Sequence, residues 1–291
     1  MTMKRFAPYF FVLPCLLLIG IFTYWPIVSS FIYSFHSWNF LSSDMPFVGL
    51  ENYRYLLEGE EFRNSLYITL VFVVISVPVR LALALLLANF LVNETKLVRF
   101  LRGAYFLPSV TSTVAISVIW SWIFATDFGL VNSILSTFGL EKVTWLQSPM
   151  LALWVVIIVN TWKQLGYDMV IYVAGLQAIP NELYEASQVD GGKKWHVFRR
   201  VTFPLVMPTT YFLLIISVVE SFQIFTIVNV MTNGGPAFAT DMLVNLLYRT
   251  GFVLFDIGQG SALAVILFVI LLVLAVVKSK LIGKKVHYEG S

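Results

Sequence analysis

Residues 65–91 read SLYITLVFVVISVPVRLALALLLANFL, an apolar run that contains a single charged residue, Arg80. A helix needs about 20 mostly apolar residues to cross the hydrocarbon core of a bilayer, which is about 30 Å thick. The run is long enough for this, so it predicts a transmembrane helix.

The composition of the whole chain supports this interpretation. Of its 291 residues, 58% are hydrophobic and 12% are charged, and the mean hydropathy is +0.83. A soluble globular protein uses roughly 25% charged residues, so this chain has too few to coat a water-facing domain of its size. The single cysteine, Cys15, excludes an internal disulfide framework. The composition predicts an integral membrane protein.

Similar apolar runs occur elsewhere in the chain, and together they predict an all-α protein with six transmembrane helices. The first run follows Lys4 and Arg5 like a signal peptide, but it is too long for the apolar part of one and lacks an A-x-A cleavage site. We therefore expect it to remain as a helix. The six runs span residues 7–35, 65–91, 103–125, 149–173, 208–231 and 258–277.

Lys and Arg are divided unequally between the two sets of connecting loops. Thirteen of the 19 fall in one set and four in the other. Loops rich in these residues stay in the cytoplasm, so both termini are expected there. The thirteen are Lys4, Arg5, Lys96, Arg99, Arg102, Lys193, Lys194, Arg199, Arg200, Lys278, Lys280, Lys284 and Lys285, and the four are Arg54, Arg63, Lys142 and Arg249.

Several kinds of site have no pattern in this sequence. No basic block with interleaved aromatic residues suggests nucleic-acid binding. The histidines, His36, His196 and His287, do not have metal-ligand spacing. There is no G-x-x-x-x-G-K-[ST] loop for ATP and no nucleophile with a matching base. We therefore expect no catalytic residues, no metal and no cofactor bound by this chain.

The longest predicted cytoplasmic connection, residues 174–207, has a patterned sequence. Asn181 followed by Glu182 predicts the start of a short helix, and Gly191 with Gly192 predicts its end. A second amphipathic stretch follows and ends at Pro204. The residues alone leave two interpretations open, a hairpin that anchors its neighbours at the membrane surface or a docking element for a partner.

Glu185-Ala186-Ser187, with Gly191 four residues later and Pro204 beyond it, resembles the EAA loop of ABC importer permeases. Ser187 stands where alanine is usual in that loop. The run 183–208 resembles the MalF/UgpA-like sugar permease group in particular. Three further stretches share the resemblance, which covers nearly the whole chain: 47–53 (FVGLENY), 232–236 (TNGGP) and 248–252 (YRTGF).

The resemblance implies a type I ABC importer permease fold in a bacterial or archaeal cytoplasmic membrane. It implies a first helix and outer loop over 1–64, a five-helix core over 65–280 and a tail over 281–291. The implied partners are a second homologous permease subunit, a cytoplasmic ATPase dimer that carries ATP and Mg, and an extracytoplasmic solute-binding protein. The residues implied to couple to the ATPase are Glu185, Ala186, Ser187, Asp190 and Gly191.

Four ionisable residues fall inside the predicted spans: Arg80, Lys163, Asp168 and Glu220. Each costs roughly 2.5 to 3.5 kcal/mol on insertion scales, so each should face the bundle interior, water or an opposite charge. A structural ion pair, for example between Lys163 and Glu220, is one explanation. The sequence gives Arg80 and Asp168 no further role.

Polar residues at helical spacing favour a functional interpretation. They form stripes near the centres of the fourth and fifth spans, with Trp162 and Phe222 nearby. Amides, hydroxyls and a carboxylate beside aromatic rings suit a ligand with many hydroxyl groups. In MalF-like permeases these two helices build the sugar site, so the resemblance implies a substrate path. Its residues are Asn160, Lys163, Gln164 and Tyr167, then Ser217, Glu220 and Ser221.

The sequence therefore predicts a permease subunit of an ATP-driven, binding-protein-dependent importer of a sugar or oligosaccharide. One alternative within this class is an importer of glycerol 3-phosphate or a related phosphorylated solute. An alternative of another class is an ion-coupled secondary transporter with Lys163, Asp168 and Glu220 as a proton relay. The EAA-like loop argues against the second alternative.

Overall fold

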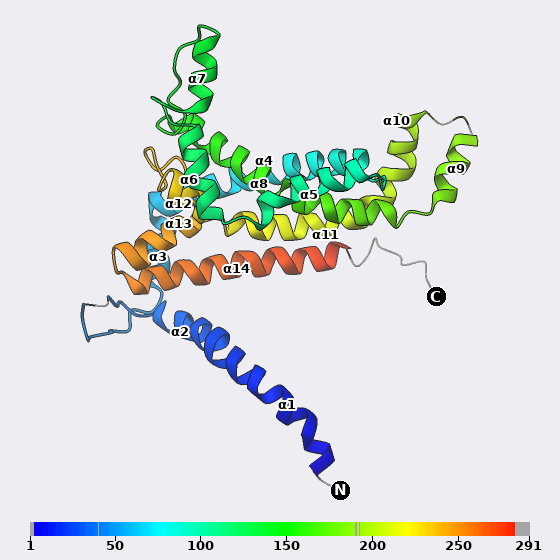
Figure 1. The fold of residues 1–291 in the computed structure, drawn as a ribbon. Coiled ribbons are helices and arrows are strands. Elements are labelled where there is room, and N and C mark those ends of the chain that lie inside the picture. Colours follow the sequence, from blue (N-terminus) through cyan, green and yellow to red (C-terminus); the bar gives the residue numbers. More distant parts are fainter. Residues whose placement is uncertain (1–2, 40, 190, 192, 283–291) are drawn as a thin grey trace. The chain divides into compact units, whose positions relative to one another are not determined.

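The computed structural model describes residues 3–39, 41–189, 191 and 193–282, and they are almost entirely helical (Figure 1). Within these residues the only β pairing consists of two isolated bridges, His36 with Phe47 and Asn39 with Asp256. The prediction of an all-α protein is confirmed. Of the expected tail, 281–291, all but the first two residues lie outside the described residues.

Among the described residues, five helices are long and apolar enough to cross a membrane, and there is a sixth crossing if one bent helix pair counts as a span. The continuous spans are Phe11–Tyr33, Glu60–Phe90, Pro149–Gln177, Lys194–Phe222 and Ile257–Val276. The main helices are α1 (Met3–Ile19), α2 (Trp25–Tyr33), α4 (Glu60–Phe90), α5 (Lys96–Val110), α6 (Thr113–Ile123), α8 (Pro149–Gln177), α11 (Phe203–Phe222) and α14 (Ile257–Ile282). The shorter ones are α3 (Glu51–Glu58), α7 (Leu130–Thr137), α9 (Asn181–Val189), α10 (Lys194–Val197), α12 (Thr226–Met231) and α13 (Leu243–Tyr248).

The third predicted span, 103–125, is not one straight helix. Helices α5 and α6 meet at an angle of 98°. Thr111 is extended, and its hydroxyl donates a hydrogen bond to the Leu107 carbonyl at 2.8 Å. Threonine side chains that bond to the backbone in this way compete with the helical ladder. The helix therefore ends just after Pro108 and restarts in another direction.

The fifth span also differs from its prediction. Pro204 does not end the amphipathic stretch, because α10, a π-helical turn at Phe198–Thr202 and α11 form one continuous helix. Pro204 lies inside this continuous helix, two residues after the π-helical turn, where the regular α-helical hydrogen-bond pattern is already interrupted. At its other end the span stops at Phe222 instead of continuing to Met231.

The helices group into two compact units. One comprises residues 3–63 and 246–272, the other 64–245 and 273–282. In the first unit Asn52 on α3 donates hydrogen bonds to the carbonyls of Ser34 and His36, both at 2.9 Å. These bonds hold the chain that leaves α2 against α3.

Helix α8 is central to the second unit. Helices α5 and α11 pack against it, and α12 packs against both α6 and α8 (Figure 1). Its buried face mixes apolar residues such as Val156 and Met169 with the polar residues Asn160, Lys163 and Asp168. A helix whose polar residues are turned inward is expected where a membrane protein binds or transports a polar solute.

The closest approach of α5 to α8 occurs at Gly166. A Cβ atom placed there would lie 1.9 Å from the carbonyl oxygen of Tyr105 and 2.8 Å from Cα of Phe106. Both obstacles are backbone atoms, so a rotamer change cannot relieve the clash. Small residues allow backbones to approach closely in membrane helix pairs, and Gly166 has this role here.

We expect Gly166→Ala to separate α5 from α8 and to destabilise the protein by about 1–3 kcal/mol or more, as overpacking does. The measurement is membrane abundance together with Tm in detergent. The matched control is Gly103→Ala in α5, where a Cβ atom meets nothing within 4 Å. Equal abundance and Tm for the two variants would contradict the close packing.

Candidate functional site

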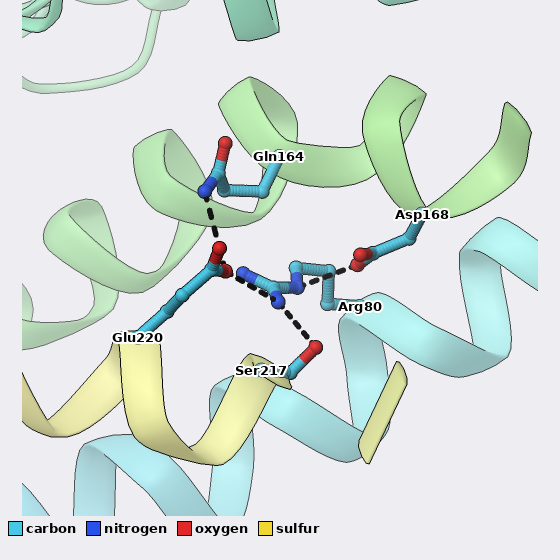
Figure 2. Close-up of polar contacts among 5 residues, drawn as sticks. All are labelled: Arg80, Gln164, Asp168, Ser217 and Glu220. Atoms are coloured by element: carbon cyan, nitrogen blue, oxygen red, sulfur yellow. Dashed lines mark hydrogen bonds and ion pairs between the residues drawn. The ribbon is translucent and has the colours of Figure 1, made fainter. Parts of the chain in front are cut away.

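Arg80 lies in the middle of α4 and is 1% exposed. Its Nε is 2.7 Å from Oδ2 of Asp168 on α8, and its Nη2 is 3.4 Å from Oε2 of Glu220 on α11. Nη2 also donates a hydrogen bond to Oγ of Ser217. Figure 2 shows the guanidinium between the two carboxylates. We call Arg80, Asp168, Ser217 and Glu220 the arginine cluster.

The two carboxylates of the arginine cluster have different surroundings. The side chain of Asp168 is 1% exposed, whereas that of Glu220 is 39% exposed. Gln164 Nε2 lies 3.5 Å from the same Glu220 oxygen, at the limit of a hydrogen bond (Figure 2). Asp168 therefore compensates the buried guanidinium, while Glu220 also presents its charge to an open space.

That space is a cavity of about 150 Å³ between α4, α8 and the end of α11. Charged groups, amides and hydroxyls make up one part of its lining, and apolar residues after α11 make up the rest. The lining residues are Arg80, Thr113, Asn160, Lys163, Gln164, Glu220, Ser221, Ile224, Phe225, Thr226 and Ile227.

Five of the seven residues predicted for a substrate path line this cavity: Asn160, Lys163, Gln164, Glu220 and Ser221. Ser217 is buried against the guanidinium, so it contacts the arginine cluster and not the cavity. Tyr167 is half-buried and does not line the cavity. The helical spacing therefore predicts which face of α8 lines the cavity, but it does not predict how far along α8 the cavity extends.

Lys163 does not form the ion pair that the sequence suggested. Among the described residues it makes no ion pair, and its Nζ donates to the carbonyl oxygen of Ser109 at 3.3 Å. Glu220 instead forms an ion pair with Arg80. The sequence showed four charges in the membrane, but only the packing of α4 determines which of them meet.

The aromatic ring at the cavity is not one of those expected. Trp162 is 41% exposed and packs edge-on against Trp120, with ring centroids 5.3 Å apart. Phe222 is buried, and Phe225 lines the cavity instead. Phe225 comes from the break between α11 and α12, which contains no glycine or proline and gave no signal in the sequence.

One hydroxyl at the cavity is left without a partner. Oγ of Ser221 is buried, and no group of the described residues accepts from it or donates to it. A buried polar atom without a partner is costly, by about 1–3 kcal/mol. The position is therefore suited to a hydrogen bond from a ligand or water in the cavity.

The predicted coupling residues lie at one end of the second unit. In Figure 1, α9 and α10 are at one end of the α8–α11 pair and α7 is at the other. Glu185 and Ala186 are exposed on α9, and Ser187 is half-buried. Gly191 has φ +73°, the left-handed conformation that favours glycine, so the predicted turn is present. Asp190 lies outside the described residues.

Most of the chain matches a known protein family. Residues 64–282 match the family described as binding-protein-dependent transport system inner membrane component. The permease protein UgpA of the sn-glycerol-3-phosphate transport system of Agrobacterium fabrum is 35% identical over 290 residues, 98% of this chain and 97% of that protein.

Other relatives carry names of sugar systems. The trehalose/maltose transport permease protein MalF of Thermococcus litoralis is 34% identical and aligns over 94% of this chain and 92% of its own length. AraP of Bacillus subtilis, an arabinooligosaccharide transport permease protein, is 33% identical over 96% of this chain and 90% of its own. A chain of a bacterial ABC transporter for alginate import has the same fold, with a TM-score of 0.87, 24% identity and 98% coverage of both chains.

The arginine cluster predicts a specific pattern of stabilities. Arg80→Gln leaves Asp168 as a buried carboxylate without its counter-charge, and breaking such a pair costs about 3–5 kcal/mol. We expect low membrane abundance and a low Tm for Arg80→Gln and for Asp168→Asn alone. The double variant removes both buried charges and should recover most of the abundance.

The matched control for this pattern is the exposed pair of Arg54 and Glu58, whose side chains are 79% and 68% exposed. Arg54→Gln should change stability by less than about 1 kcal/mol, because solvent screens such a pair. If Arg80→Gln is as abundant and as stable as Arg54→Gln, the arginine cluster does not hold the helices together.

Proposed function

Because the chain belongs to the family of binding-protein-dependent transport system inner membrane components, we propose that it carries a sugar or oligosaccharide across the membrane through the cavity beside Glu220. As a member of this family it is a multi-pass permease component of an ABC importer in the inner membrane. The observation that supports a sugar is the set of polar groups at the cavity.

Those groups match what a sugar offers. Lys163 is a donor, Glu220 is an acceptor, and the amides of Asn160 and Gln164 are both. Phe225 adds an aromatic ring to the same wall. A sugar needs many hydrogen bonds around its ring and an apolar surface for its faces, and this cavity supplies both.

In this proposal the energy comes from another polypeptide. The family is a permease component whose ATPase is a separate subunit. We therefore propose no enzymatic role for this chain and place ATP and Mg on a cytoplasmic ATPase dimer. The further partners are a second homologous permease subunit and an extracytoplasmic solute-binding protein. An ion-coupled mechanism is not proposed, because family membership and the fixed Arg80–Asp168 pair both argue against a proton relay.

The docking element for the ATPase would be α9 with the turn at Gly191. Val189 is 88% exposed and Leu183 43% exposed on this short helix, beside the carboxylate of Glu185. Apolar side chains on an exposed helix beside a charge suit a protein interface. In this proposal both termini and this element are cytoplasmic, as the distribution of Lys and Arg predicts.

A phosphorylated solute is the second candidate. The relative from Agrobacterium fabrum is named for sn-glycerol-3-phosphate transport. Lys163 at the cavity is the group that would meet a phosphate in this case.

The cavity can be tested by uptake of radiolabelled solutes in cells that express the whole importer. Asn160→Ala, Gln164→Ala and Ser221→Ala each remove a hydrogen bond to the solute, at about 1–3 kcal/mol. Uptake efficiency should fall about 5- to 150-fold while membrane abundance is unchanged. Tyr167→Phe tests whether the solute also contacts α8 at Tyr167, which lies outside the cavity lining.

The control for these variants is Gln147→Ala, an exposed amide that pairs with Thr126 in the loop before α8. It should transport normally. Normal uptake by all three cavity variants would mean that the solute does not pass through this cavity.

The docking element can be tested with two matched pairs. Gly191→Leu forces a bulky residue into φ +73° and Glu185→Lys reverses a charge, so both should abolish uptake without loss of abundance. Gly139 has the same φ of +73° and, like Gly191, open space around it. Gly139→Leu and Glu141→Lys, in the loop after α7, should retain uptake. Equal uptake within each pair would identify α9 as an anchor only.

A further inference from the structure

The charged groups at the cavity are balanced. Arg80 and Lys163 are positive, Asp168 and Glu220 are negative, and all four belong to the arginine cluster or line the cavity. The cluster alone has one negative charge more than positive, and Lys163 compensates it. The formal charges at the cavity therefore sum to zero, so the site has no net positive charge to attract an anionic ligand.

The most exposed charge at the cavity is that of Glu220. Its side chain is 39% exposed, whereas Arg80 is 1% exposed and Lys163 8% exposed. Arg80 is also held from both sides, because Nε faces Asp168 and Nη2 faces Glu220 and Ser217. The guanidinium cannot turn toward the ligand without leaving Asp168 as a buried lone charge.

The remaining polar groups are uncharged and incompletely paired. Oγ of Ser221 is buried without a partner, and the Gln164 amide contacts Glu220 only at 3.5 Å. Asn160 is 8% exposed and also lines the cavity. Hydroxyl groups of a ligand can donate to the Glu220 carboxylate and to Ser221, and can accept from the amides and from Lys163.

The volume agrees with a ligand of one ring. The cavity measures about 150 Å³, and a cavity of about this size is known to hold a single benzene ring in another protein. A single pyranose or furanose ring is of the same order, with its hydroxyl groups directed at the polar wall.

From these observations we propose that Glu220 makes the cavity selective for an uncharged, hydroxyl-bearing sugar ring and disfavours a ligand with a carboxylate or phosphate group. Arg80 acts as a positioning residue that fixes the Glu220 carboxylate at the cavity wall. The inference rests on the proposed function and narrows it, since it separates neutral sugars from the phosphorylated solute that was the second candidate. Placing an anion beside the Glu220 carboxylate juxtaposes like charges, which is costly in a partly dehydrated site.

The experiment uses the complete importer in proteoliposomes and, separately, the detergent-solubilised importer without its solute-binding protein. The probes are neutral monosaccharides, the corresponding uronic acids, glycerol and glycerol 3-phosphate. Uptake identifies which probes are transported, and calorimetry on the solubilised importer measures which of them the membrane part binds. We expect the importer to bind the neutral member of a transported pair at least about tenfold more tightly than its acid.

Three variants test whether the preference for neutral over acidic ligands depends on the charge of Glu220. Glu220→Gln is close in shape and removes the charge, so the ratio of the two affinities should fall to about threefold or less. Glu220→Asp keeps the charge and should retain discrimination, and Glu141→Gln, an exposed residue that does not line the cavity, should match the parent protein. Membrane abundance of each variant is measured alongside.

The possible results distinguish a failure of this inference from a failure of the proposed transport function. Tighter binding of the acid or of glycerol 3-phosphate by the parent protein, or an unchanged ratio in Glu220→Gln, overturns the inference while the proposed transport function stands. Transport of a probe that the solubilised importer does not bind also overturns it, because the cavity is then not a binding site. If no probe is transported, the proposed function itself fails, and the inference fails with it.

Discussion

A guanidinium buried inside a membrane-spanning helix must be met by opposite charge, and in this protein that requirement determines how three helices pack. Arg80 on α4 needs Asp168 from α8, and it reaches Glu220 and Ser217 on α11 at the same time. A buried ion pair adds little net stability, because desolvation offsets most of the attraction. Its effect is on specificity, since a rotation of either neighbouring helix would leave a bare charge in an apolar region.

The cavity is a consequence of this packing. The arginine cluster holds Glu220 between α4 and α8, and the chain then leaves the helical conformation after Phe222. The break turns Phe225 and its neighbours toward the polar face of α8 instead of continuing the helix. Polar residues that would be costly against lipid are thereby enclosed by protein, which is where a polar solute can be bound within a membrane.

Much of this architecture follows from local sequence. The length of the apolar runs predicts the helices, because the thickness of the bilayer sets the same requirement everywhere along the chain. The polar stripe on α8 predicts which face carries Asn160 and Gln164, because helical periodicity is a local property. The glycine turn at Gly191 is similarly local.

The tertiary contacts and the helix breaks that depend on them could not be predicted from the sequence. The partner of Glu220 is Arg80 and not Lys163, and the two members of this pair are 140 positions apart in the chain. The bend after α5 involves the side chain of Thr111, and the break after α11 contains neither glycine nor proline. Such breaks depend on side-chain bonds and packing against neighbours, so periodicity alone extends a helix through them.

The continuous helix from Lys194 to Phe222 joins the region of α9 and α10 to the cavity beside Glu220. Its 29 residues extend about 44 Å at 1.5 Å per residue. Within this helix the π-helical turn at Phe198–Thr202 keeps the backbone hydrogen-bonded, so the helix continues without a break from Lys194 to Phe222. A rigid tilt of about 5° about its Lys194 end moves the other end, where Glu220 lies, by about 4 Å. A displacement of this size exceeds the length of a hydrogen bond, so a small tilt of this helix is enough to break the contacts that Glu220 and Ser217 make with Arg80.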